Sequence, residues 1–112
     1  MKYESLTPYS DGDINEIMRT CDEEKIKLLP LAIGEYHNDF MFAQNFCFEL
    51  LKTGSNDEIR ANAALGLSYL ARRFQRLDKI IIPYLREEMK KNETFIDRVQ
   101  YSVEDIYLFM GW

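Results

Sequence analysis

The sequence has few of the residues that build metal, redox or phosphate sites. Its 112 residues include two cysteines, one histidine, five glycines and three prolines. No H-E-x-x-H, C-x-x-C, EF-hand or glycine-rich phosphate-loop pattern occurs, and Cys21 and Cys47 lack metal-ligand spacing. These absences predict no catalytic residue, no cofactor and no metal site. We expect both cysteines to be reduced thiols that serve as small buried hydrophobic side chains.

Long hydrophobic runs are absent as well. No stretch approaches the roughly 20 apolar residues that span a bilayer, and the N-terminal residues lack the apolar core of a secretory signal. We therefore expect a cytoplasmic protein that makes no membrane contact. Because 46% of the residues are hydrophobic, the chain is too apolar for intrinsic disorder. Its length fits a single domain over residues 1–112.

Negative charge is concentrated at the N-terminus. The chain has 19 acidic and 14 basic residues, a net charge of -5. Residues 1–24 hold seven acidic and two basic residues, whereas the rest of the chain is balanced. A basic stretch over residues 72–91 holds seven basic and three acidic residues. The acidic balance argues against direct nucleic-acid binding, which needs a basic surface.

Apolar residues recur at helical rather than strand spacing along most of the chain. A short first helix begins near Asp11 or Asp13. Favoured N-cap residues precede the later apolar stretches, at Asp22, Asn38 or Asp39, Asn56 or Asp57, Asp78 and Thr94. Pro30 should kink the second helix, and Gly54 and Gly111 should end the third and the last. The pattern predicts an all-α fold of about six helices.

A degenerate repeat underlies these helices. The isoleucines that follow three of the polar starts, Ile26, Ile59 and Ile96, lie 33 and 37 residues apart. A period of this length is typical of stacked helix pairs that bury their apolar faces on one another. The helix that begins near residue 56 is rich in Ala and Gly, so we place it centrally. We expect an acidic N-terminal helix within residues 1–21, repeats over 22–55 and 56–92, and a half-repeat over 93–112.

Few side chains suggest chemistry. A catalytic interpretation would pair His37 with Asp39 as base and orienting acid, but residues two apart do not face each other on a helix. We expect His37 to have a loop or capping role. The adjacent carboxylates Glu104 and Asp105 diverge by about 100° on a helix, so they cannot act together on one bond. Arg60 is expected to form a structural ion pair.

Residues 56–79, with the sequence NDEIRANAALGLSYLARRFQRLDK, resemble the pattern of small bacterial HEAT-like proteins. Residues 39–44 and 103–109 are similar to the same group, and the resemblance extends over roughly residues 22–112. Ser68-Tyr69 departs from an expected Gly-His, and residues 100–102 are larger than expected. Proteins of this type resemble immunity proteins encoded beside contact-dependent or polymorphic bacterial toxins. The resemblance implies a short HEAT-like α-solenoid and no enzymatic activity.

These observations predict a protein that binds a cognate toxin domain, a basic nuclease, and occludes its active surface. Acidic residues would accelerate association with a basic partner, and tyrosines are enriched at protein interfaces. The candidate contact residues are Glu4, Asp11, Asp13, Glu16, Tyr36, Asp39, Tyr69, Arg72, Glu104 and Tyr107. One alternative is a helical-repeat scaffold or subunit of a larger complex. Another is a HEAT-like nucleic-acid-binding protein that uses the basic stretch. The sequence also permits a homodimer that forms through an exposed end of the helical array.

Overall fold

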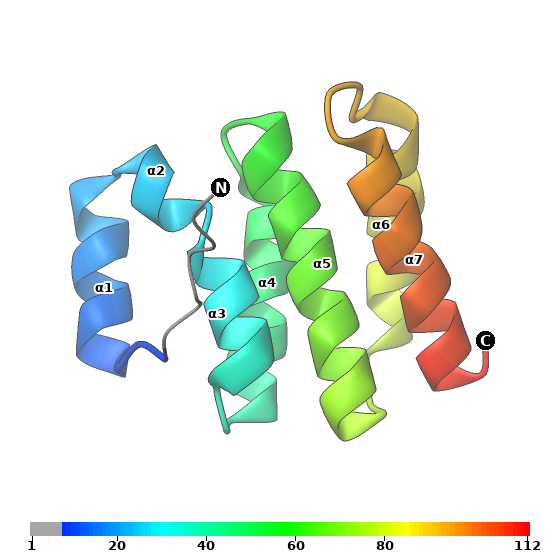
Figure 1. The fold of residues 1–112 in the computed structure, drawn as a ribbon, viewed down its shortest axis with the longest axis horizontal. Helices are drawn as coiled ribbons and strands as arrows, with labels where there is room; N and C mark the ends of the chain where they lie inside the picture. The colour runs from blue at the N-terminus through cyan, green and yellow to red at the C-terminus, as the bar shows by residue number, and fades with distance from the viewer. Residues whose placement is uncertain (1–7) are drawn as a thin grey trace, which may run out of the picture.

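The computed structural model describes residues 8–112, which fold into seven α-helices and one 3₁₀ turn (Figure 1). No strand occurs among these residues, so the all-α prediction is confirmed. In chain order the elements are α1 (Asp11–Thr20), α2 (Glu23–Ile26), α3 (Leu29–Tyr36), α4 (Phe40–Thr53), α5 (Asp57–Phe74), η1 (Lys79–Ile81), α6 (Ile82–Lys91) and α7 (Ile96–Met110).

The helices form two layers, with α3, α5 and α7 in front of α4 and α6 in Figure 1. Helix α5 is central because it packs against α3, α4 and α7. Its small residues permit this: a Cβ atom added to Gly66 would overlap the carbonyl oxygen of Pro30 and lie 3.0 Å from the Cys47 sulfur. The backbones of α3 and α5 are therefore in direct contact, as the small residues of this helix predicted.

Most helices begin where the sequence indicated. The side chains of Asp22, Asp39, Asn56 and Asp78 accept hydrogen bonds from backbone N–H groups of the following turn. The first helix is capped one residue earlier than expected, by Ser10. The Ser10 hydroxyl accepts from the Asp13 N–H at 3.1 Å while the Asp13 carboxylate accepts from the Ser10 N–H at 3.2 Å. This reciprocal pair is a capping box.

Two local predictions were wrong. Pro30 does not kink a continuous helix, because α2 ends at Ile26 and Pro30 lies in the first turn of α3. A missing N–H costs no internal hydrogen bond at that position. Thr94 does not cap the last helix, which begins after Phe95. The N–H of Phe95 donates instead to the side-chain oxygen of Asn92, at 3.0 Å.

The two cysteines differ in their surroundings. Cys47 is fully buried between α4, α3 and α5, and burial raises the pKa of its thiol because the thiolate would lose its hydration. Cys21 is exposed and ends α1 in a left-handed conformation with φ of 56°. The expectation that both are buried hydrophobic side chains therefore holds for Cys47 alone.

Candidate partner-binding surface

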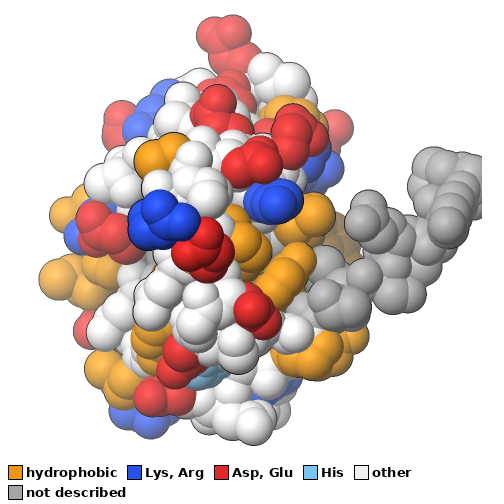
Figure 2. Space-filling model, turned by 90° about the vertical axis from the view of Figure 1, so that its left-hand side faces the viewer, with side chains coloured by type: hydrophobic (Ala, Val, Ile, Leu, Met, Phe, Trp, Pro, Cys, Tyr) orange, Lys and Arg blue, Asp and Glu red, His pale blue; other side chains and the backbone are white. Residues whose placement is uncertain are grey.

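One end of the molecule, built by α1 and α2, is rich in acidic side chains. Figure 2 faces this end and shows carboxylates spread across it. We call the exposed carboxylates of residues 11–24 the acidic end. It contains Asp11, Asp13, Glu16, Glu23 and Glu24. The side chains of Glu16 and Glu24 are 61% and 81% exposed, so a partner can reach both. The predicted contact residue Glu4 lies outside the described residues.

His37 joins the acidic end to the helical array. Its Nε2 lies 3.0 Å from a carboxylate oxygen of Asp11, and its Nδ1 accepts a hydrogen bond from the Asp39 N–H at 3.1 Å. The ring also stacks on Phe42, with centroids 4.6 Å apart. The carboxylate of Asp39 accepts from the N–H of Phe42 and caps α4. His37 therefore bridges two segments, and its contact with Asp39 is to the backbone rather than to the carboxylate.

Tyr69 and Arg72 lie beside each other on α5, next to α3. The Arg72 guanidinium is 5.1 Å from the centre of the Tyr69 ring and forms an ion pair of 2.7 Å with Glu35. Tyr36, the residue after Glu35, is exposed and lines a small cavity together with His37. The structure thus places Asp11, Tyr36 and Asp39 around the end of α3, and connects Tyr69 and Arg72 to the same helix.

Glu104 and Tyr107 lie on α7, at the opposite end of the array from α1 (Figure 1). Glu104 is exposed, whereas the Tyr107 hydroxyl accepts a hydrogen bond from Arg86 at 3.3 Å. The Tyr107 ring also packs edge-on against Trp112. The predicted contact residues therefore do not form one continuous surface, because two of them are separated from the acidic end by the whole array.

The basic stretch is largely occupied by internal contacts. The guanidinium of Arg73 donates to the carbonyl oxygens of Gly34 and His37 at 2.6 and 2.8 Å and so satisfies the C-terminal end of α3. Arg76 lies 4.5 Å over the ring of Phe40, and Lys79 lies 5.8 Å from the ring of Trp112. Because these cations serve different helix junctions, they do not converge on one anion site.

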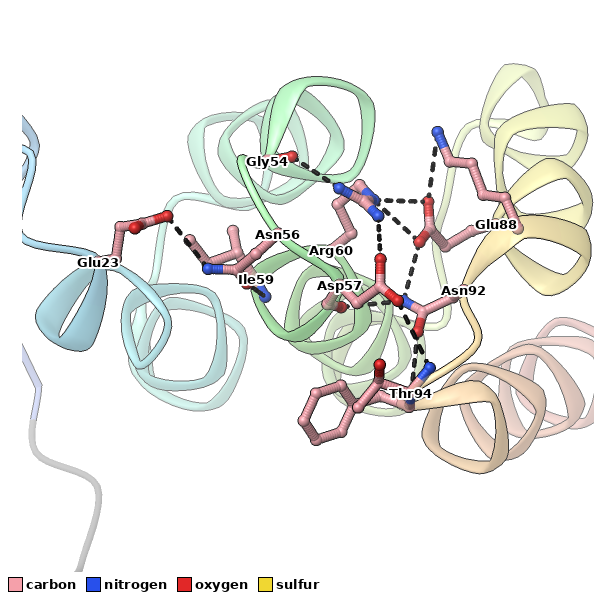
Figure 3. A network of polar contacts seen from close by, with 11 residues as sticks. Glu23, Gly54, Asn56, Asp57, Ile59, Arg60, Glu88, Asn92 and Thr94 are labelled. Carbon is pink, nitrogen blue, oxygen red and sulfur yellow. Dashed lines mark hydrogen bonds and ion pairs between the residues drawn. The ribbon is translucent and has the colours of Figure 1, made fainter.

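Arg60 is the centre of a partly buried polar network between the helix pairs (Figure 3). Its Nε donates to both carboxylate oxygens of Glu88, at 3.2 and 3.0 Å. One terminal nitrogen donates to the Gly54 carbonyl oxygen at 2.9 Å, and the other pairs with Asp57. The predicted structural ion pair of Arg60 is therefore confirmed, and its main partner comes from α6.

Glu88 and Asn92 are members of this network that the sequence did not reveal. The Glu88 side chain is 1% exposed. The Asn92 amide donates to Glu88 and to the carbonyl oxygen of Asp57, both at 2.9 Å. A signal was present, because Glu88 lies three residues after the buried Leu85, on the apolar face of α6. A carboxylate on such a face indicates a buried partner.

A second polar group lies in a groove of about 620 Å³ that is lined by α2, the start of α3, α5 and α7. Lys27 pairs with Glu24 and Glu58 at 2.9 and 3.6 Å. Arg98 donates to the Asn62 side chain at 2.6 Å, and Asn62 donates to the Lys27 carbonyl oxygen at 2.8 Å. The hydrogen bond to Glu24 and, to a smaller extent, the charge of Glu58 raise the pKa of Lys27. The charges in this groove satisfy one another.

The described residues form neither a metal-ligand cluster nor a membrane-spanning helix. Residues 8–112 contain no group of three or more His, Cys, Asp or Glu side chains that could hold a metal ion. None of their helices is both long and apolar enough to cross a membrane.

Comparison with known proteins finds a match in structure but not in sequence. No protein-family profile and no curated protein matches the chain. A chain in the crystal structure of a CDI complex from Cupriavidus taiwanensis LMG 19424 superimposes with a TM-score of 0.79 at 20% sequence identity. The match covers 97% of each chain. The two chains share a fold. The resemblance noted from the sequence is thus supported by the arrangement of the helices over nearly the whole chain.

Proposed function

We propose that this chain is an immunity protein that binds and neutralises a cognate bacterial toxin of the contact-dependent growth inhibition type. One observation carries the proposal: the fold matches a chain of a CDI complex over 97% of both lengths. The polar side chains of the described residues support a non-enzymatic role. His37, Arg60 and Arg73 are held by structural contacts rather than gathered around a cleft.

The acidic end supports a basic partner, and we propose a nuclease domain whose nucleic-acid site is covered on binding. A surface that binds phosphates is rich in Lys and Arg, so an acidic inhibitor complements it. Complementary charge raises the association rate, while affinity comes from buried contacts at the centre of the interface. Tyr36, which is exposed next to His37, is a proposed central contact.

Co-expression tests the proposal. The proposal predicts that a toxin domain is encoded beside this chain; that domain is expressed alone, with this chain, and with an unrelated immunity protein. We expect this chain, but not the unrelated immunity protein, to restore growth. We also expect this chain and the toxin domain to co-elute from a size-exclusion column. Continued killing in the presence of well-expressed immunity protein, or separate elution, would show that the proposal is wrong.

The scaffold alternative has one observation in its favour. Tyr101 and Leu108 lie two turns apart on α7 and are 60% and 74% exposed. Glu104 lies between them on the same face, so they form no continuous apolar stripe, but exposed apolar side chains at an end of an array can contact a further subunit or a second copy of the chain. If the acidic end binds the toxin, Leu108→Ser should leave rescue of growth intact. If α7 is a dimer contact, the same variant should abolish the self-association that sedimentation measures.

A further inference from the structure

A cleft of about 440 Å³ opens between the α1–α2 corner and the turn from α4 to α5. Its apolar walls come from Met18 on α1, Ile26 on α2, Leu50 on α4 and Ile59 on α5. The last three side chains are otherwise buried, so the cleft exposes an edge of the core. Its volume lies in the range of small-ligand pockets and accommodates a long side chain from a partner.

The rim of the cleft favours a positive charge. The Glu23 carboxylate lines it, and one carboxylate oxygen accepts hydrogen bonds from Ser55 and from the Asn56 side chain, the latter at 3.1 Å. Figure 3 shows Glu23 reaching from α2 towards Asn56. The other carboxylate oxygen accepts no hydrogen bond from the described residues. One acceptor therefore remains available at the rim.

The C-terminal ends of α1 and α4 line the cleft together with the N-terminal end of α5, so the partial charges of these helix ends offset one another in part and Glu23 supplies the negative charge. Met18 and Cys21 line the cleft at the C-terminal end of α1, and Thr53 and Gly54 line it at the C-terminal end of α4. A helix C-terminus carries about half a negative charge. The Gly54 carbonyl oxygen already accepts from Arg60. No Lys or Arg is among the described residues that line the cleft.

We propose that this cleft binds an arginine side chain of the partner, an inference that rests on the proposed function for the partner's identity. The aliphatic stem of an arginine packs along Met18, Ile26 and Leu50, and its guanidinium reaches the open carboxylate oxygen of Glu23. Arginine suits this geometry because its stem is apolar and its planar head donates several hydrogen bonds in fixed directions. Arginine is also enriched among the residues that dominate interface energies.

A titration with n-butylguanidinium chloride tests the site without the toxin. Amide shifts of ¹⁵N-labelled protein are followed as the probe is added, with n-butanol as the uncharged comparison. We expect saturable shifts at Cys21, Glu23 and Gly54 with the cation, and much weaker shifts with the alcohol. Shifts that do not saturate, or that spread equally over all acidic residues, overturn the proposal.

A matched pair of variants sharpens the test. Glu23→Gln removes the charge but keeps an oxygen that accepts from Ser55 and Asn56, so the fold is preserved. We expect it to weaken probe binding about two- to fivefold, the range of an exposed ion pair. Glu16→Gln makes the same charge change on α1 outside the cleft and should have no such effect. Equal weakening by both variants overturns the proposal.

The outcomes separate the two proposals. Saturable binding of the probe supports the cleft even if co-expression fails to rescue growth. If rescue succeeds and the probe does not bind, the cleft assignment is wrong and the immunity function stands. If both the immunity function and the arginine cleft are correct, Glu23→Gln should lower the affinity of the purified toxin complex more than Glu16→Gln does.

Discussion

The centre of the array and its acidic end use charged residues in opposite ways. Around α5, the cations Arg60 and Arg73 bond to groups from other helices, 28 to 39 residues away in sequence. On α1, Arg19 pairs with Glu16 within one turn, and the neighbouring carboxylates are exposed. Charges at the centre therefore hold helices together, whereas charges at the acidic end form mostly local pairs and remain exposed to solvent.

The centre of the array and its acidic end also differ in how tightly their helices pack. Helix α5 buries ten residues, and its Gly66 touches the backbone of α3. Helix α1 buries only Ile14, and a Cβ atom on its Gly12 would approach no atom more closely than the Ser10 hydroxyl, at 3.8 Å. The centre should therefore be intolerant of substitution, and α1 tolerant. The following substitutions test this comparison, from the largest expected effect to the smallest.

Removal of Arg60 should have the largest effect. Arg60→Met leaves the Glu88 carboxylate, which is almost fully buried, without its main partner. Breaking a buried pair on one side costs about 3–5 kcal/mol of unfolding free energy. Urea denaturation measures this loss. Arg19→Met, which breaks an exposed pair on α1, should leave the urea midpoint unchanged, and equal losses in both variants would contradict the division.

The same substitution at two glycines should have opposite signs. Gly66→Ala introduces a methyl group against the Pro30 carbonyl and should cost about 1–3 kcal/mol by overpacking. Gly12→Ala makes only an ordinary van der Waals contact with the Ser10 hydroxyl and should stabilise the protein by up to about 1 kcal/mol, because Ala favours the helix. Thermal unfolding by circular dichroism measures both. A loss of stability at Gly12 would show that α1 is packed more tightly than the structure indicates.

The smallest effect is kinetic and needs the toxin domain. Glu16→Gln combined with Glu24→Gln should slow association about two- to fivefold at low salt, with little change at high salt, because long-range attraction is screened. Stopped-flow mixing across a salt series measures this rate. The control, Asp97→Asn with Glu104→Gln, removes two charges on α7. If the control slows association as much, net charge rather than the acidic end steers the partner.

Much of the helical pattern was predictable because it depends on near neighbours. The caps at Asp22, Asp39, Asn56 and Asp78 and the left-handed Gly111 follow from contacts within one turn. The bond that precedes α7 is equally local but was missed. Asn92, the residue after α6, accepts a hydrogen bond from the N–H of Phe95, three residues further along the chain. The same side chain also donates to the Asp57 carbonyl oxygen, 35 residues away, and no local pattern displays that contact.

The candidate contact surface was predictable only in part. The charge count located the acidic end, but it did not show that Glu104 and Tyr107 lie on α7 at the far end of the array. It also did not reveal that Asp11 pairs with His37, 26 residues away. The cleft beside Glu23 was not predicted at all, since its walls come from four helices.

The sequence by itself determined the all-α class, the caps at Asp22, Asp39, Asn56 and Asp78, the central helix rich in small residues and the position of the surplus negative charge. Each depends on composition or on residues within a turn of one another. Only the tertiary structure decided which charged side chains bond to other helices and which remain exposed to solvent. In the sequence, Arg73 and Glu16 are both charged residues of helices, and the pattern alone would place both side chains on the surface. Packing of α5 against α3 brings the Arg73 guanidinium to two free carbonyl oxygens, and no helix covers Glu16.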